Sequence, residues 1–187
     1  ERIILEEQLP DWCDEPYAPA PVEGLKVYHL YAELTSDQYE FASIETKESC
    51  SPVVMQTSTD FFNSPVGTVT NSPNFNVFCA FVPEIAFDSF ISIGTSSGFI
   101  PNIFTDLSSP NELGRHYLKP GSATLYFDHG SIFVLPGEGQ GVPDENLRLF
   151  LGQFSTTGVI DYQINVGIYD TKTGIVHYYY NSECSGL

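Results

Sequence analysis

Apolar residues occupy every second position between residues 160 and 168, and this alternation constrains the fold more than any other feature of the chain. Strict alternation places one set of side chains on the buried face of a β-strand and the other set on its solvent face. Residues 147–154 and 175–180 also have strand composition, and turn-forming sequences separate them from the alternating segment. The pattern predicts a three-stranded antiparallel meander with the alternating segment at its centre. The buried set would be Ile160, Tyr162, Ile164, Val166 and Ile168, and the solvent-facing set would be Asp161, Gln163 and Asn165.

Strand-like segments in the rest of the chain extend this pattern. The sequence between them is rich in Gly and Pro, and no segment has the period of a helix of ordinary length. Residues 36–37 and 128–130 have the composition of hairpin turns. We therefore expect an all-β fold, an antiparallel β-sandwich of the jelly-roll type. The predicted strands lie at residues 25–34, 39–44, 53–55, 77–82, 87–93, 123–127 and 131–135.

The first 24 residues differ from the rest of the chain. They hold seven acidic residues against one base, and four prolines that disfavour a continuous helix. We expect an extended N-terminal arm or linker over residues 1–24 and a β-sandwich domain over residues 25–187. The arm contains apolar residues that need a partner surface, either on this domain or on a neighbouring copy, unless the terminus is frayed. These residues are Ile3, Ile4, Leu5 and Leu9.

The net charge of −17 limits the partners of the chain, which has 24 acidic and seven basic residues. Nucleic acids and anionic membrane surfaces are bound through basic side chains, so neither is expected as a partner. No apolar run approaches the roughly 18 residues that a transmembrane helix needs. An acidic surface suits divalent cations or a basic protein patch, and it also serves solubility alone.

Four widely spaced cysteines predict disulfide bonds. An even number of cysteines without a C-x-x-C pair is typical of secreted proteins, and the lack of a leading Met fits a processed, exported chain. We therefore expect a location outside the cell or at its surface. Of three possible connectivities we favour Cys50–Cys79 and Cys13–Cys184, and four buried thiols are the alternative.

One acidic loop carries the oxygen ligands that calcium prefers. Residues 136–146 are rich in glycine and contain Glu138, Asp144, Glu145 and Asn146. Their spacing is not that of an EF-hand, so no cofactor is required by the sequence and calcium is one possibility. The alternative is a solvated turn.

The sequence offers little support for an enzyme. Residues 94–98 match G-x-S-x-G, which would make Ser96 the nucleophile of a hydrolase. The motif needs a helix directly after it, and Pro101 disfavours one. The four histidines form no paired motif. We expect a Gly/Ser loop here and no enzymatic activity.

Tyrosines gather on the last predicted strand. In an extended strand Tyr178 and Tyr180 share one face, and Tyr179 takes the other. The shared face could stack on sugar rings or on another protein, and packing within the core is the alternative.

Two segments, residues 81–94 and residues 149–160 continuing into 164–166, carry a familiar pattern. They resemble a secreted β module of extracellular and surface proteins in marine bacteria and algae, over about residues 27 to 168. The chain departs from that pattern at Phe90, where Trp is usual, and at Tyr162, where Gly is usual. The resemblance implies export and β structure, and it brings no catalytic residue.

Together these features predict an extracellular structural or adhesive module. The favoured mechanism is self-assembly into a homo-oligomer, polymer or matrix, in which residues 3–9 add as a strand to a neighbouring copy or pack on it. Other surface proteins are the alternative partners. The alternative is a carbohydrate-binding module that stacks glycans on tyrosines, with or without calcium.

Overall fold

The protein is an antiparallel β-sandwich, as the sequence predicts. The computed structural model describes residues 1–10, 20–47, 51–64, 79–94, 102–104, 121–137 and 139–180. Within these residues no helix is long and apolar enough to cross a bilayer. The strands in chain order are β1 (Arg2–Gln8), β2 (Lys26–Glu33), β3 (Tyr39–Glu45), β4 (Val53–Thr57), β5 (Phe90–Ile91), β6 (Asn102–Phe104), β7 (Thr124–Phe127), β8 (Ser131–Phe133), β9 (Arg148–Thr156), β10 (Ile160–Gln163), β11 (Val166–Asp170) and β12 (Ile175–Tyr179), and the 3₁₀ helix η1 spans Pro83–Phe87.

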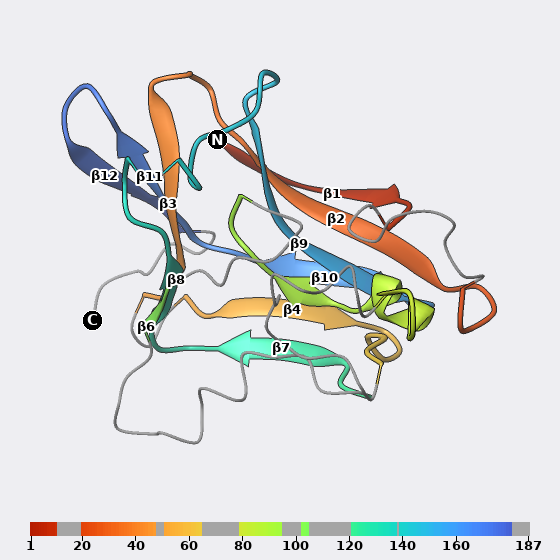
Figure 1. Ribbon diagram of the computed structural model, residues 1–187. Coiled ribbons are helices and arrows are strands. Elements are labelled where there is room, and N and C mark those ends of the chain that lie inside the picture. Colours follow the sequence, from red (N-terminus) through yellow and green to blue (C-terminus); the bar gives the residue numbers. More distant parts are fainter. Residues whose placement is uncertain are drawn as a thin grey trace.

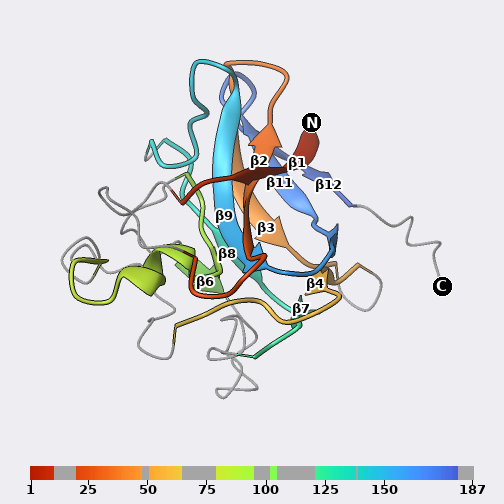
Figure 2. The same ribbon diagram turned by 90° about the vertical axis from the view of Figure 1, so that its right-hand side faces the viewer.

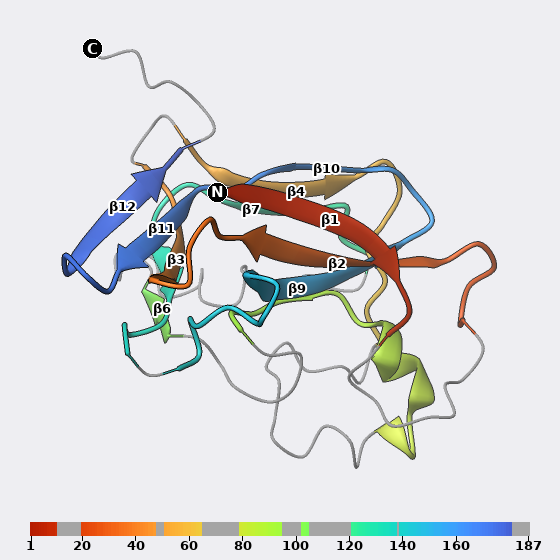
Figure 3. The same cartoon turned by 90° about the horizontal axis from the view of Figure 1, so that it is seen from above.

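One layer of the sandwich is a four-stranded sheet with the order β1-β2-β9-β5 (Figures 1 and 3). Its inner face contributes fully buried residues such as Leu30 and Leu151 to the main hydrophobic core. Its outer face packs against η1, where Phe87, Phe90 and their neighbours form a second, smaller cluster. Figure 2 shows η1 on the side of β9 that faces away from β3 and β11. This sheet therefore has apolar packing on both faces.

The other layer consists of two sheets that meet at a corner. Their strand orders are β10-β4-β7 and β12-β11-β3-β8-β6. Four pairs of consecutive strands belong one to each sheet, namely β3 and β4, β6 and β7, β7 and β8, and β10 and β11. Figure 1 shows β3 and β4 running at a steep angle to each other. Strands that bend and change sheets are a known way for β-structures to turn a corner.

Asn165 fixes this corner, since it lies between β10 and β11 and is fully buried. Its Nδ2 donates hydrogen bonds to the carbonyl oxygens of Glu45 (3.1 Å) and Ser51 (2.9 Å). Its Oδ1 accepts a hydrogen bond from Ser51 Oγ (2.8 Å), and its own carbonyl accepts one from the Glu45 N–H (3.0 Å). One residue thus joins two of the four crossings, the one between β3 and β4 and the one between β10 and β11.

The predicted meander is wrong, although its strands exist. β10 pairs with β4, and β9 pairs with β2 and β5, so only the hairpin of β11 and β12 remains. The alternating segment is interrupted at Ile164 and Asn165, where the chain changes sheets. Ile164, Val166 and Ile168 are all buried, because both sheets border the same core. Asn165, which was expected to face solvent, is buried at the corner.

Two predicted hairpins and one predicted strand are also wrong. Residues 36–37 and 128–130 connect strands of different sheets. Their composition correctly indicates a bend, but it does not show whether the flanking strands pair with each other. Residues 79–82 lead into η1, where residues 77–82 were expected to form a strand. Pro83 suits the first turn of a helix, where its missing N–H costs nothing. Of the predicted strand 87–93, only β5 is extended.

Residues 2–8 are part of the β domain and not a free arm. β1 pairs with β2 along its whole length and forms one edge of the four-stranded sheet. The expected boundary at residue 24 therefore does not separate β1 from the domain. Ile3 and Leu5 pack against the main core, so their partner surface lies on the same chain. Ile4 lies opposite Tyr31 in the register, and Leu9 is exposed.

Candidate functional site

Two tyrosines lie side by side at the edge of the five-stranded sheet. β12 is the edge strand there, and it carries Tyr178, with Tyr180 directly after its end. Their ring centroids are 6.3 Å apart, and the ring planes differ by 24°. Tyr178 is 53% exposed, whereas Tyr180 is half-buried. The structure therefore brings together the two tyrosines that the sequence placed on one face.

A glycine beneath Tyr178 lets its ring lie close to the sheet. Gly167 on β11 is the cross-strand neighbour of both Tyr178 and Ser43. A Cβ atom on Gly167 would lie 2.4 Å from Ser43 Oγ and 3.1 Å from Tyr178 Cε1. Any side chain at this position would displace the tyrosine ring. The position of the Tyr178 ring thus depends on Gly167, which lies opposite it on the neighbouring strand β11.

Polar groups from β3 and the segment after it complete the site. The Tyr180 hydroxyl donates a hydrogen bond to Glu45 Oε1 (2.7 Å), and Ser43 Oγ donates one to Glu45 Oε2 (3.2 Å). Lys47 Nζ lies 5.2 Å from the centroid of the Tyr180 ring, a cation–π distance. Burial, together with the bond to Glu45, raises the pKa of Tyr180 well above its usual range, so the phenol keeps its proton.

We call this group the tyrosine platform. It combines the exposed ring of Tyr178 with the neighbouring Tyr180, whose hydroxyl bonds the Glu45 carboxylate and whose ring lies under the Lys47 ammonium group. An aromatic face attracts C–H groups that carry partial positive charge, and the polar groups can bond hydroxyls at its side. Its members are Tyr178, Tyr180, Gly167, Ser43, Glu45 and Lys47.

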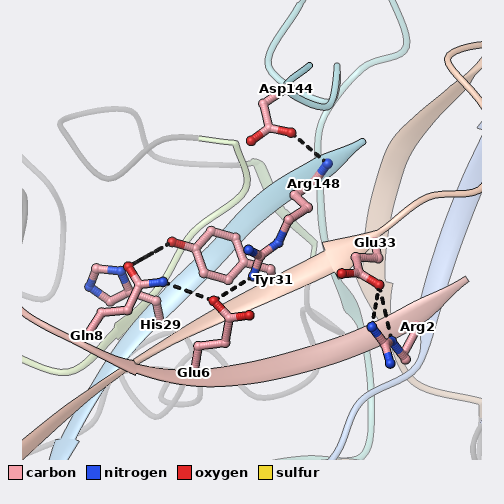
Figure 4. A network of polar contacts seen from close by, with 8 residues as sticks. All are labelled: Arg2, Glu6, Gln8, His29, Tyr31, Glu33, Asp144 and Arg148. Carbon is pink, nitrogen blue, oxygen red and sulfur yellow. Dashed lines mark hydrogen bonds and ion pairs between the residues drawn. The ribbon is translucent and has the colours of Figure 1, made fainter. Parts of the chain in front are cut away.

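A second polar group crosses β1, β2 and β9 (Figure 4) and holds β1 in place. Arg148 on β9 lies 2.9 Å from the Glu6 carboxylate of β1, and its guanidinium carbon lies 4.2 Å from the ring centroid of Tyr31. The hydrogen bond from Arg148 lowers the pKa of Glu6. Arg2 pairs with Glu33 at 2.7 Å in the same way. A further ion pair joins Lys26 of β2 to Glu7 of β1 at 2.8 Å.

His29 is a structural residue within this second group. It is fully buried, and its Nε2 lies 3.1 Å from Gln153 Oε1. Gln153 Nε2 in turn donates to the carbonyl oxygens of Ala86 and Asp88, both at 2.9 Å. His29 therefore connects β2 through β9 to the chain around the end of η1, and no solvent-accessible reactive set surrounds it among the described residues.

The predicted calcium loop is only partly described. Asp144 Oδ1 accepts hydrogen bonds from the backbone N–H groups of Asn146 (2.9 Å) and Arg148 (2.8 Å), so it already stabilises the turn before β9. Glu145 and Asn146 are exposed, and Glu138 lies outside the described residues. No group of three acidic, His or Cys side chains that could hold a metal exists within the described part. Calcium binding stays a prediction.

Most of the predicted disulfide cysteines, and the serine of the G-x-S-x-G motif, lie outside the described residues. Cys79 packs against the second cluster, whereas Cys13, Cys50 and Cys184 lie outside the described residues. Both predicted pairings therefore stay predictions. Ser96 lies outside the described residues as well.

Sequence reasoning found the tyrosines of the platform and missed the residues around them. Gly167 stands between two apolar residues of the alternating segment 160–168, and Glu45 and Lys47 belong to no sequence motif. These residues meet the tyrosines only through the pairing of β12 with β11 and of β11 with β3. A cross-strand pattern of this kind depends on the register, which a single sequence does not state.

Comparison of the chain with protein-family models, curated proteins and solved structures found no match. The resemblance to secreted β modules therefore stays a prediction.

Proposed function

We propose that the protein is an extracellular adhesive module that binds neutral saccharides at the tyrosine platform. The exposed ring of Tyr178 is the observation that carries this proposal, since it lies close to the sheet above Gly167 and next to Tyr180, which in turn contacts Glu45 and Lys47. The fold supports it, because an antiparallel sheet can present one edge and face to a ligand while the rest stays packed.

The chemistry of the platform suits a sugar ring. The C–H groups of a pyranose would stack on Tyr178, and ring hydroxyls would donate to Glu45 and accept from Lys47. Lys47 already lies over the Tyr180 ring, so Tyr178 offers the more open aromatic surface. The net charge of −17 disfavours the binding of polyanionic glycans, so we propose a neutral saccharide as the ligand.

Self-assembly through residues 3–9 is the weaker proposal. It was motivated by apolar residues without a partner, and Ile3 and Leu5 contact the main core of their own domain. β1 already pairs with β2 and is held there by ion pairs to Glu33, Lys26 and Arg148, so a neighbouring copy would have to pair with the outer edge of β1, which no described strand covers.

Replacing Tyr178 with Ala should weaken saccharide binding by about tenfold or more, since losing one aromatic stacking partner costs about 1.4 kcal/mol. A glycan array followed by titration calorimetry with the best neutral ligand measures this. Tyr126→Ala is the matched control, because Tyr126 is 51% exposed on β7, in the other sheet of the bent layer. Equal affinities for wild type and Tyr178→Ala, or an equal loss in Tyr126→Ala, would contradict the proposal. We expect binding to persist in EDTA, because the platform supplies one carboxylate, Glu45, and a calcium ion needs several oxygen ligands.

Gly167→Ala should weaken binding without removing any side chain that contacts the ligand. Its Cβ would force Ser43 Oγ and the Tyr178 ring away from their present positions. We expect a measurable loss of affinity that is smaller than that of Tyr178→Ala, with the chain still folded, because the ring needs to shift by only a few tenths of an ångström. Gly167→Ala with Ser43→Ala removes the contact with Ser43 and retains the one with Tyr178, so affinity should not return. Full recovery in this double variant would show that the Tyr178 ring is not the displaced group.

A further inference from the structure

A cavity of about 310 Å³ lies between β1 and β2 of one layer and β10, β11 and β12 of the other. Five aliphatic residues form most of its wall, and four of them are almost completely buried. Two tyrosines and two exposed charged residues complete it. The lining is Ile3, Ala32, Ile164, Val166 and Ile168, with Tyr162, Tyr179, Glu1 and Arg2.

The polar groups of this lining already have partners. The Tyr162 hydroxyl donates to the carbonyl oxygen of Ile3 (3.3 Å). Arg2 donates through both Nε and Nη2 to Glu33 Oε2. Glu1 accepts a hydrogen bond from Thr35 (3.0 Å). These bonds use part of the polar lining, and an apolar body that replaces poorly held water next to the aliphatic wall gains affinity.

We propose that this cavity binds a compact neutral molecule with an aromatic or branched aliphatic body and one uncharged polar group, such as a hydroxyl. The volume is about twice the ~150 Å³ of an engineered cavity that holds benzene, so one substituted ring fits. The rim carries one positive and one negative side chain, Arg2 and Glu1, and therefore offers no excess charge for an ion. The hydroxyl of Tyr179, which also interacts with Glu1, is the polar group on the β12 side of the cavity.

The cavity is separate from the tyrosine platform. Tyr178 and Tyr179 are successive residues of β12 and point to opposite faces of the sheet. Tyr179 lines the cavity, and Tyr178 belongs to the platform. The two sites can therefore be removed independently, and this inference does not rest on the saccharide proposal.

Titration of methyl-labelled full-length protein with benzyl alcohol and indole, followed by NMR, tests the cavity. We expect saturable shifts of the methyl signals of Ile3, Ile164 and Ile168 with both probes, and at least tenfold weaker binding of benzoate, an anion of similar size. Ala32→Leu fills space next to Ile3, and it should weaken the binding of both probes at least tenfold and raise the melting temperature.

Two further variants keep the test decisive. Ala32→Val, which adds less volume, replaces Ala32→Leu if the latter does not fold, and Tyr178→Ala should leave probe binding unchanged. The proposal is overturned by the absence of saturable methyl shifts, by unchanged probe affinity in a folded Ala32 variant, or by benzoate affinity equal to that of benzyl alcohol.

Discussion

Asn165→Ala should lower the free energy of unfolding by about 3–5 kcal/mol, because buried polar groups lose their partners and each such group costs about 1–3 kcal/mol. The substitution removes the side-chain bonds to the carbonyls of Glu45 and Ser51 and leaves Ser51 Oγ without its acceptor. The loss is a large part of the roughly 5–15 kcal/mol that stabilises a typical domain. Urea unfolding followed by far-UV circular dichroism measures it.

Asp161→Ala is the matched control for this prediction. Asp161 lies on the same face of the predicted alternating strand, but it is exposed on β10, and its side chain accepts a hydrogen bond from Gln56 (3.1 Å). Exposed substitutions of this kind change stability by about 0.5 kcal/mol or less. If the Asn165 and Asp161 variants unfold at the same urea concentration, Asn165 does not hold the corner.

The comparison of these two residues shows how far the alternation could predict the fold. A period of two correctly identifies strands and the apolar side of each, because Ile164, Val166 and Ile168 are buried as expected. It does not indicate a corner, since the chain bends without changing which side faces the core. Nor can it distinguish a solvent-facing amide from one that bonds neighbouring backbone, because both occupy the same position in the pattern.

The N-terminal strand was obscured for a different reason. Acidic residues and prolines made residues 1–24 resemble a linker, and the carboxylates of β1 and β2 are in fact paired with bases. Arg2, Lys26 and Arg148 are three of only seven bases in the chain, and they lie far apart in the sequence. Their use in holding one acidic strand depends on tertiary structure, which charge counts along the chain do not contain.

The largest pH-dependent effect should come from Asp88, next to the end of η1. Asp88 is only 5% exposed, and its Oδ1 accepts a hydrogen bond from the Ser64 N–H (2.6 Å). Burial raises the pKa of this carboxyl to about 7, against the lowering effect of the Ser64 bond and with a smaller contribution from Glu84. The folded protein therefore holds a proton between about pH 4 and pH 7 that the unfolded chain releases. Stability falls as the pH rises through this range, by about 4 kcal/mol for a shift of about three pKa units, and the loss is complete above pH 7.

Asp88→Asn should remove this dependence, because an amide is neutral at every pH and its oxygen can still accept the Ser64 hydrogen bond. We expect the variant to match the wild type near pH 4.5 and to exceed its free energy of unfolding by about 2–4 kcal/mol at pH 8. Urea unfolding at both pH values measures the difference between the two proteins, which cancels the titration of all other groups. Glu84→Gln, which removes only the nearby charge, should shift the same difference slightly in the same direction. A difference between wild type and Asp88→Asn that is the same at pH 4.5 and pH 8 would mean that Asp88 is ionised in the folded protein throughout this range, and that burial at η1 does not control its proton.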